Sequence, residues 1–282
     1  MKLKPIVIAL GYGSVSVAML ALSAQQAQAD TMYNPYGTKG QFVDPWVGTT
    51  NGSLPFGYNG NQNLNWAVLI DGNDPVQNKL TISEADALTK YNTAVTLDVG
   101  RGAWFDGTTP GSGWGHTVDF GLFKSSVDTN LTISAKSLIP GTKLGFTLFT
   151  GMDSAGSSYG RHRAWNTGPG YQPAIFVNPR TNSNPFGTTG VNYLAHAAPD
   201  EGNYNSATGE TTYTLPVVAG QVYSLYIGGS NTLFSSPGAG PSSLGYQVSF
   251  TPSQVPLPAA AWLMGGGLIT LFAAGRKKTL GA

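Results

Sequence analysis

Four side chains of this sequence have the chemistry to hold a transition metal. The three histidines are His116, His162 and His196, and Trp114 stands two positions before the first of them. Histidine is the commonest metal ligand among the side chains, and residues two apart in a strand share a face. A copper site is therefore one interpretation. The other is that Trp114 packs at the start of a strand while His116 bonds to a turn.

The Trp114-Gly115-His116 segment resembles the copper-binding motif of the MopE and CorA type of bacterial surface proteins. That resemblance implies that Trp114 is an oxidised ligand and that His116 supplies an imidazole. It also implies a second imidazole, from His162 or His196. Arg161 and Arg163 flank His162 and disfavour a cation there.

A second candidate metal site rests on carboxylates. Asp71 and Asp74 enclose an Asp-Gly-Asn-Asp segment, and Asp98 and Asp106 follow in neighbouring loops. Calcium takes about six to eight oxygen ligands, so these four aspartates are candidates for calcium. Asp-Gly is also a common turn signal, and a simple turn is the alternative.

Aromatic residues in predicted loops are candidates for stacking on sugar rings. They are Trp46, Trp165 and Tyr171. The alternative is that each ring covers one end of the hydrophobic core.

Enzymatic chemistry finds little support in the sequence. The glutamates are Glu84, Glu201 and Glu210, and Glu84 is assigned to a helix cap. No phosphate loop or dinucleotide fingerprint occurs, and the absence of cysteine removes thiol nucleophiles and disulfides. We expect a protein that is not an enzyme and that has no resident cofactor.

The first 29 residues predict a secretory signal peptide. Lys2 and Lys4 precede apolar runs, and Ala27-Gln28-Ala29 has the small-x-small pattern of a signal peptidase site. The mature chain is expected to start at Asp30.

The other end predicts a temporary membrane stop. The apolar run Ala259–Ala274 has sixteen residues, whereas a spanning helix usually needs about 20. The cations behind it favour the cytoplasmic side of the inner membrane.

Without the five basic residues of the two ends, the body has ten basic and fourteen acidic residues, which gives a net charge near −4. Such a body has no electrostatic footprint for nucleic acid.

The tail resembles the PEP-CTERM class of sorting signals in its VPLPA variant. The resemblance rests on Val255, Pro256, Leu257, Pro258 and Ala259, the apolar run, and the cluster of Arg276, Lys277 and Lys278. It implies recognition by an exosortase-like membrane protease, which cuts near the motif and sends the protein to the cell surface or beyond. It implies no activity for the body.

Period-two alternation of apolar residues predicts many short strands in the body. We expect an all-β fold, an antiparallel β-sandwich of jelly-roll-like form, with one short helix from the Ser83 cap to about Lys90. A signal helix and a hydrophobic C-terminal helix flank it. The predicted strands are Trp66–Ile70, Ala94–Val99, Thr117–Phe123, Asn130–Ala135, Leu144–Phe149, Ala174–Val177, Val191–Ala195, Thr211–Val218, Val222–Ile227 and Tyr246–Thr251.

The strand sequences from residue 116 onward are similar to the pre-peptidase C-terminal type of bacterial β-sandwich, which implies an accessory module. The expected layout is a signal peptide over 1–29, an N-terminal arm over 30–65, a β-sandwich body over 66–254 and a sorting and membrane segment over 255–278. The function expected is a structural or adhesive role at the cell surface or in the extracellular matrix, in contact with polysaccharide.

Overall fold

The fold is taken from a computed structural model of the full chain. The structure describes residues 30–35, 46–58, 64–71, 79–101, 103, 118–152, 191–199, 202–230 and 243–253. The predicted signal helix, the predicted C-terminal helix and the predicted strand Ala174–Val177 lie outside these residues.

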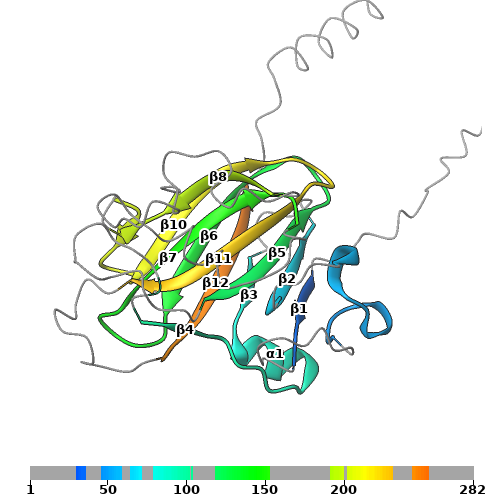
Figure 1. The fold of residues 1–282 in the computed structure, drawn as a ribbon, viewed down its shortest axis with the longest axis horizontal. Helices are drawn as coiled ribbons and strands as arrows, with labels where there is room; N and C mark the ends of the chain where they lie inside the picture. Colours follow the sequence, from blue (N-terminus) through cyan, green and yellow to red (C-terminus); the bar gives the residue numbers. More distant parts are fainter. Residues whose placement is uncertain are drawn as a thin grey trace, which may run out of the picture.

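The described residues form two β-sheets and one short α-helix (Figure 1). Sheet A has six strands in the order β1-β2-β5-β11-β7-β8, and sheet B has the order β3-β12-β6-β10-β9 with β4 beside β12. Sheet A contains β1 (Asp30–Tyr33), β2 (Trp66–Ile70), β5 (Asp119–Ser125), β11 (Val222–Ser230), β7 (Lys143–Thr150) and β8 (Asn192–Ala197). Sheet B contains β3 (Leu80–Ile82), β4 (Asp98–Gly100), β6 (Thr129–Ser137), β9 (Tyr204–Asn205), β10 (Glu210–Val217) and β12 (Ser243–Ser253).

The strand pairs are antiparallel except for one. β2 and β5 run parallel, with Trp66 opposite Gly121 and Ile70 opposite Ser125. The chain between them passes through β3, α1 and β4, and a crossover of that length is what a parallel pair requires. The prediction of a wholly antiparallel sandwich is therefore wrong at this pair.

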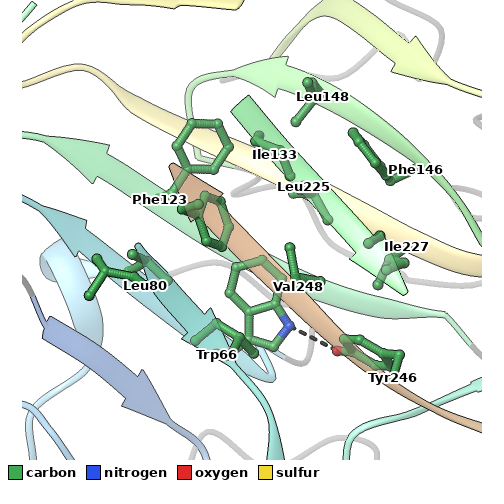
Figure 2. Close-up of a cluster of buried hydrophobic side chains, with 14 of the residues drawn as sticks. Trp66, Leu80, Phe123, Ile133, Phe146, Leu148, Leu225, Ile227, Tyr246 and Val248 are labelled. Carbon is green, nitrogen blue, oxygen red and sulfur yellow. Dashed lines mark hydrogen bonds between the residues drawn. The ribbon is translucent and has the colours of Figure 1, made fainter. Parts of the chain in front are cut away.

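The two sheets pack face to face around the main core. Trp66 from sheet A meets Phe250 of sheet B edge to face, with ring centroids 5.8 Å apart, and the Phe123 ring lies 5.5 Å from the Phe250 ring. Figure 2 shows Trp66 and Phe123 among the buried side chains of this core. Gly121 makes room for this packing, because a Cβ there would lie 2.2 Å from the Trp66 ring. Aromatic rings from the two sheets thus contact each other in the main core.

The central strands of sheet A are buried on both faces, whereas sheet B is buried on one. In β6 the burial alternates along the whole strand, with one face in the core. In β11, by contrast, every residue after Val222 is buried. A second apolar cluster on the far face of sheet A explains this difference, and it includes Tyr58, Phe120, Phe149 and Tyr226.

The helix α1 (Glu84–Tyr91) confirms the capping prediction. The Ser83 hydroxyl accepts a hydrogen bond from the Asp86 amide at 3.0 Å, and Asn92 ends the helix in the left-handed conformation. The assignment of Glu84 to the cap is wrong. Its carboxylate instead accepts from the Leu97 amide at 3.0 Å and fixes the chain that follows the helix.

Most predicted strands occur within a few residues of their expected bounds, and Trp66–Ile70 matches at both ends. Ala94–Val99 is wrong over 94–97, because only Asp98–Gly100 pairs with β12. The short strands β1, β3 and β9 were not predicted. The expected N-terminal arm contributes β1, which pairs with β2 and places Tyr33 in the main core.

Candidate functional site

A buried carboxyl group lies at one end of the sandwich, where three strands meet. Asp119 opens β5, Tyr246 lies on β12 and Trp66 opens β2. The Tyr246 hydroxyl donates to Asp119 Oδ2 at 2.6 Å and accepts from Trp66 Nε1 at 2.9 Å (Figure 2 shows the second bond). These three residues form the Asp119 relay, a chain of hydrogen bonds from the core to the start of β5.

Burial controls the protonation of this relay. Three effects together raise the pKa of Asp119 to about 8. Removal from water is the largest and raises the pKa, the hydrogen bond from Tyr246 lowers it, and repulsion from the Asp98 carboxylate raises it. Burial likewise raises the pKa of Tyr246 well above its ordinary value. Asp119 is therefore neutral at pH 7 and gains a charge near pH 8.

Asp98 is oriented beside this relay by its neighbours in sheet B. It pairs with Gly245 across β4 and β12, and the Ser243 hydroxyl donates to its carboxylate. No pattern in the sequence indicates the Asp119 relay, because its members lie far apart in the chain and Asp119 lies within an ordinary predicted strand. Only strand pairing brings them together.

A second polar network fixes the N-terminal strand to the helix. Tyr33 Oη and Thr31 Oγ1 each donate to Asp86 Oδ2 at 2.7 Å. Lys90 Nζ lies 2.9 Å from Asp86 Oδ1 and donates to Thr31 Oγ1 at 3.0 Å. Burial, and then the bond to Asp86, raises the pKa of Tyr33 well above its usual value. The strand β1 is thus an integral part of the fold.

Asp30, the expected first residue of the mature chain, belongs to the same network. Tyr91 Oη lies 2.6 Å from Asp30 Oδ1 and 2.5 Å from the Thr31 carbonyl oxygen, and donates toward both. Burial raises the pKa of Tyr91 well above its usual range, and the bond to Asp30 acts in the same direction. We call the contacts of Asp30, Thr31 and Tyr33 with α1 the N-terminal clasp.

Aromatic rings form a row across the outer face of sheet A. Phe120 stacks on Tyr226 with centroids 4.7 Å apart, and Tyr58 lies 5.8 Å from Phe120. Phe149 meets Tyr226 at 5.8 Å and Tyr193 at 6.1 Å, both edge to face. The row is a packed layer, since four of these rings are at least nine-tenths buried and Tyr193 is half-buried.

His196 lies at the edge of this row. Its Nδ1 shares a hydrogen bond with the Tyr193 hydroxyl, so the ring is oriented by its own strand. Thr147 pairs with both His196 and Tyr226, and its fully buried hydroxyl has no partner among the described residues. The described ranges contain no group of three or more His, Asp or Glu side chains that could hold a metal.

The other residues of the predicted copper site lie outside the described part of the chain. They are Trp114, His116 and His162. His196 is therefore the member of that site whose position is known. With Nδ1 engaged by Tyr193, Nε2 is the nitrogen that a metal would use.

The proposed sugar contact of Trp46 is wrong. Its side chain is only 3% exposed and packs in the second apolar cluster, so its ring face is not open to a ligand. Its Nε1 has no hydrogen-bond partner within the described residues. The other two aromatic candidates, Trp165 and Tyr171, lie outside them.

Asp71 and Asp98 do not share a calcium site. Asp71 accepts from the Ser126 hydroxyl at 3.2 Å, beyond the last residue of β5. Asp98 acts on Asp119, the first residue of β5. The length of a seven-residue strand, roughly 20 Å, therefore separates them. Asp74 and Asp106 lie outside the described residues.

The predicted signal peptide and the predicted sorting tail lie outside the described residues, next to the first and the last of them. β1 begins at Asp30, directly after the Ala27–Ala29 site, and β12 ends at Ser253, two residues before Val255. No helix in the described ranges is long and apolar enough to cross a membrane. The predicted cleavage and sorting residues that lie outside the described ranges are Ala27, Ala29, Val255, Pro256, Leu257, Pro258, Ala259, Arg276, Lys277 and Lys278.

Comparison with known proteins gives little. No family model matches the chain, and no curated protein matches it. One similar solved structure is CorA, a surface-associated copper-binding protein important in copper acquisition by Methylomicrobium album BG8. It is 17% identical, the match covers 55% of this chain and 92% of that one, and the TM-score is 0.33. A likeness of that size carries no argument about this chain.

Proposed function

We propose that this chain is an exported protein of the cell surface or extracellular matrix with a structural or adhesive role. Signal peptidase removes residues 1–29, the tail holds the chain briefly in the inner membrane, and an exosortase-like protease then processes it. The body contacts extracellular polysaccharide and has no catalytic function.

One observation carries the proposal. Among the described residues the strands begin at Asp30 and end at Ser253, so the two predicted address segments directly adjoin the first and the last described strand. The clasp uses Asp30 itself, which suits cleavage after Ala29. The chain contains no cysteine, so it needs no disulfide formation outside the cell. Its many packed strands suit a domain that is stable without disulfides.

Substitution of the two prolines of the sorting motif tests this function. Pro256 and Pro258 hold the segment extended, so Pro256→Ala with Pro258→Ala should leave full-length protein in the inner membrane. Pro216→Ala is the matched control, because Pro216 is exposed on β10 and lies far from the tail in sequence. Fractionation and intact-mass measurement in cells with an exosortase read the result. Unchanged processing of the double variant would refute the sorting step.

A second proposal is a copper-binding surface protein that uses Trp114 and His116, with a further imidazole from His162 or His196. It is supported by the hydrogen bond that orients the His196 ring. Metal analysis of the purified protein separates the two functions. The structural role predicts no stoichiometric copper, whereas the second proposal predicts one copper that His116→Ala removes.

A further inference from the structure

The first described strand begins, and the last one finishes, at the same end of the sandwich. In sheet A, Asp30 lies opposite Leu69, which in turn lies opposite Lys124 near the end of β5. In sheet B, Ser253 lies opposite Asn130 near the start of β6. Because a short turn joins β5 to β6, these two rows lie at one end of the sandwich. We call it the proximal end.

Two turns form the tip of the proximal end, one between β5 and β6 and one between β10 and β11. Hydrogen bonds join them: the Ala219 amide donates to Asp128 Oδ1 at 2.7 Å, and the Gly220 amide donates to the Ser125 carbonyl oxygen at 2.8 Å. Val218 is 60% exposed, and Asp128 is the one charged residue in the two turns. Such a tip can approach lipid headgroups without the cost of desolvating several charges.

A short connector joins the proximal end to the predicted membrane segment. Residues 254–258 separate Ser253 from the apolar run that starts at Ala259. A fully extended chain of that length spans at most roughly 18 Å. The nine residues of β6, by contrast, extend roughly 30 Å toward the other end of the sandwich. While the tail is in the membrane, the connector therefore keeps the proximal end near the lipid surface.

The turn between β6 and β7 marks the opposite end of the sandwich. Leu138 begins this turn, is 54% exposed, and donates its amide to the Gly245 carbonyl oxygen at 2.8 Å. The Asp119 relay lies at this end too, because Tyr246 pairs with Ser137, the last residue of β6. The two ends of β6 thus give two exposed aliphatic side chains, Val218 and Leu138, at opposite ends of the body.

We propose that the proximal end rests on the lipid surface of the inner membrane while the tail holds the chain there, and that the opposite end faces away from the membrane. This inference rests on the proposed function and names the part of the body that contacts the membrane. The predicted signal peptide leaves the fold at Asp30, at the same end. Both membrane segments can therefore be inserted together without a rearrangement of the strands.

Single cysteine labels test this orientation, because the chain contains no cysteine of its own. Val218→Cys places a fluorophore on the tip of the proximal end, and Leu138→Cys is the matched control, a similarly exposed aliphatic position at the opposite end. Each full-length variant is reconstituted into vesicles of phosphatidylethanolamine and phosphatidylglycerol whose headgroups carry a collisional quencher in both leaflets. We expect roughly threefold stronger quenching at position 218, since the strand length between the two positions is roughly 30 Å.

The other outcomes overturn the inference, and they separate it from the proposed function. Equal strong quenching at both positions would mean that the body lies on its side, and stronger quenching at position 138 would mean that it is inverted. Weak quenching at both positions would place the whole body away from the lipid. In these cases the chain still floats with the vesicles in a density gradient, and the proposed membrane hold stands. Failure of the wild-type chain to float would overturn the membrane hold and this inference together.

Discussion

The protonated state of Asp119 predicts how the stability of this protein depends on pH. The unfolded chain releases the proton near pH 3.8, whereas the folded chain holds it to about pH 8. Between these values the folded state binds one more proton, so the free energy of unfolding falls as pH rises. The slope is about 1.4 kcal/mol per pH unit. Between pH 4 and pH 8 the free energy of unfolding falls by roughly 6 kcal/mol in total. The contribution of Asp119 is fully present below pH 4 and is lost above pH 8.

The substitution Asp119→Asn isolates this effect from the other titrating groups. The amide is neutral at every pH, and its oxygen can still accept the hydrogen bond from Tyr246. We therefore expect the variant to gain stability relative to the wild type as pH rises from 5 to 8. Urea titrations of the purified protein at several pH values measure the difference in free energy of unfolding.

A result independent of pH would refute the reasoning, because it would mean that folded Asp119 is already ionised at neutral pH. Tyr246→Phe provides a second check. It removes the hydrogen bond that opposes the rise in pKa, so Asp119 should titrate at still higher pH. It also leaves the buried Trp66 Nε1 without its acceptor, at a cost of about 1–3 kcal/mol.

Three further predictions concern packing, the clasp and the tail. Gly121→Ala should destabilise the fold by about 1–3 kcal/mol, because its methyl group would overlap the Trp66 ring. In Gly245→Ala, by contrast, the methyl group would meet Leu138 at an ordinary 3.5 Å, and thermal unfolding should show little change. Asp86→Ala removes the acceptor of Tyr33 and Thr31 and should lower the free energy of unfolding by about 2–3 kcal/mol; an unchanged denaturation midpoint would argue against the clasp. Deletion of Val255–Ala282 should leave a soluble body with an unaltered, strand-rich circular dichroism spectrum that reductant does not change, and loss of folding would show that the tail belongs to the core.

Features that depend on neighbouring residues could be predicted from the amino-acid sequence alone. The strand Trp66–Ile70 and the alternation of β6 follow from period-two patterns, and α1 follows from the cap at Ser83. Each depends on side chains within one turn or a few positions along a strand, and such patterns are visible without a partner. The patterns that predict the two address segments are local in the same sense.

Which segments become partners depends on how the two sheets pair and pack, and it is visible only in the folded structure. Trp66 lies beside Gly121, and Tyr246 reaches Asp119 across 127 positions of the chain. Burial of both faces of sheet A made Trp46 a core residue, although its loop position had suggested a ligand contact. The pKa of Asp119 depends on the water that folding removes from around it. That quantity is a property of the packed sheets and of no sequence segment, because desolvation is the sum of contacts from strands distant in the chain.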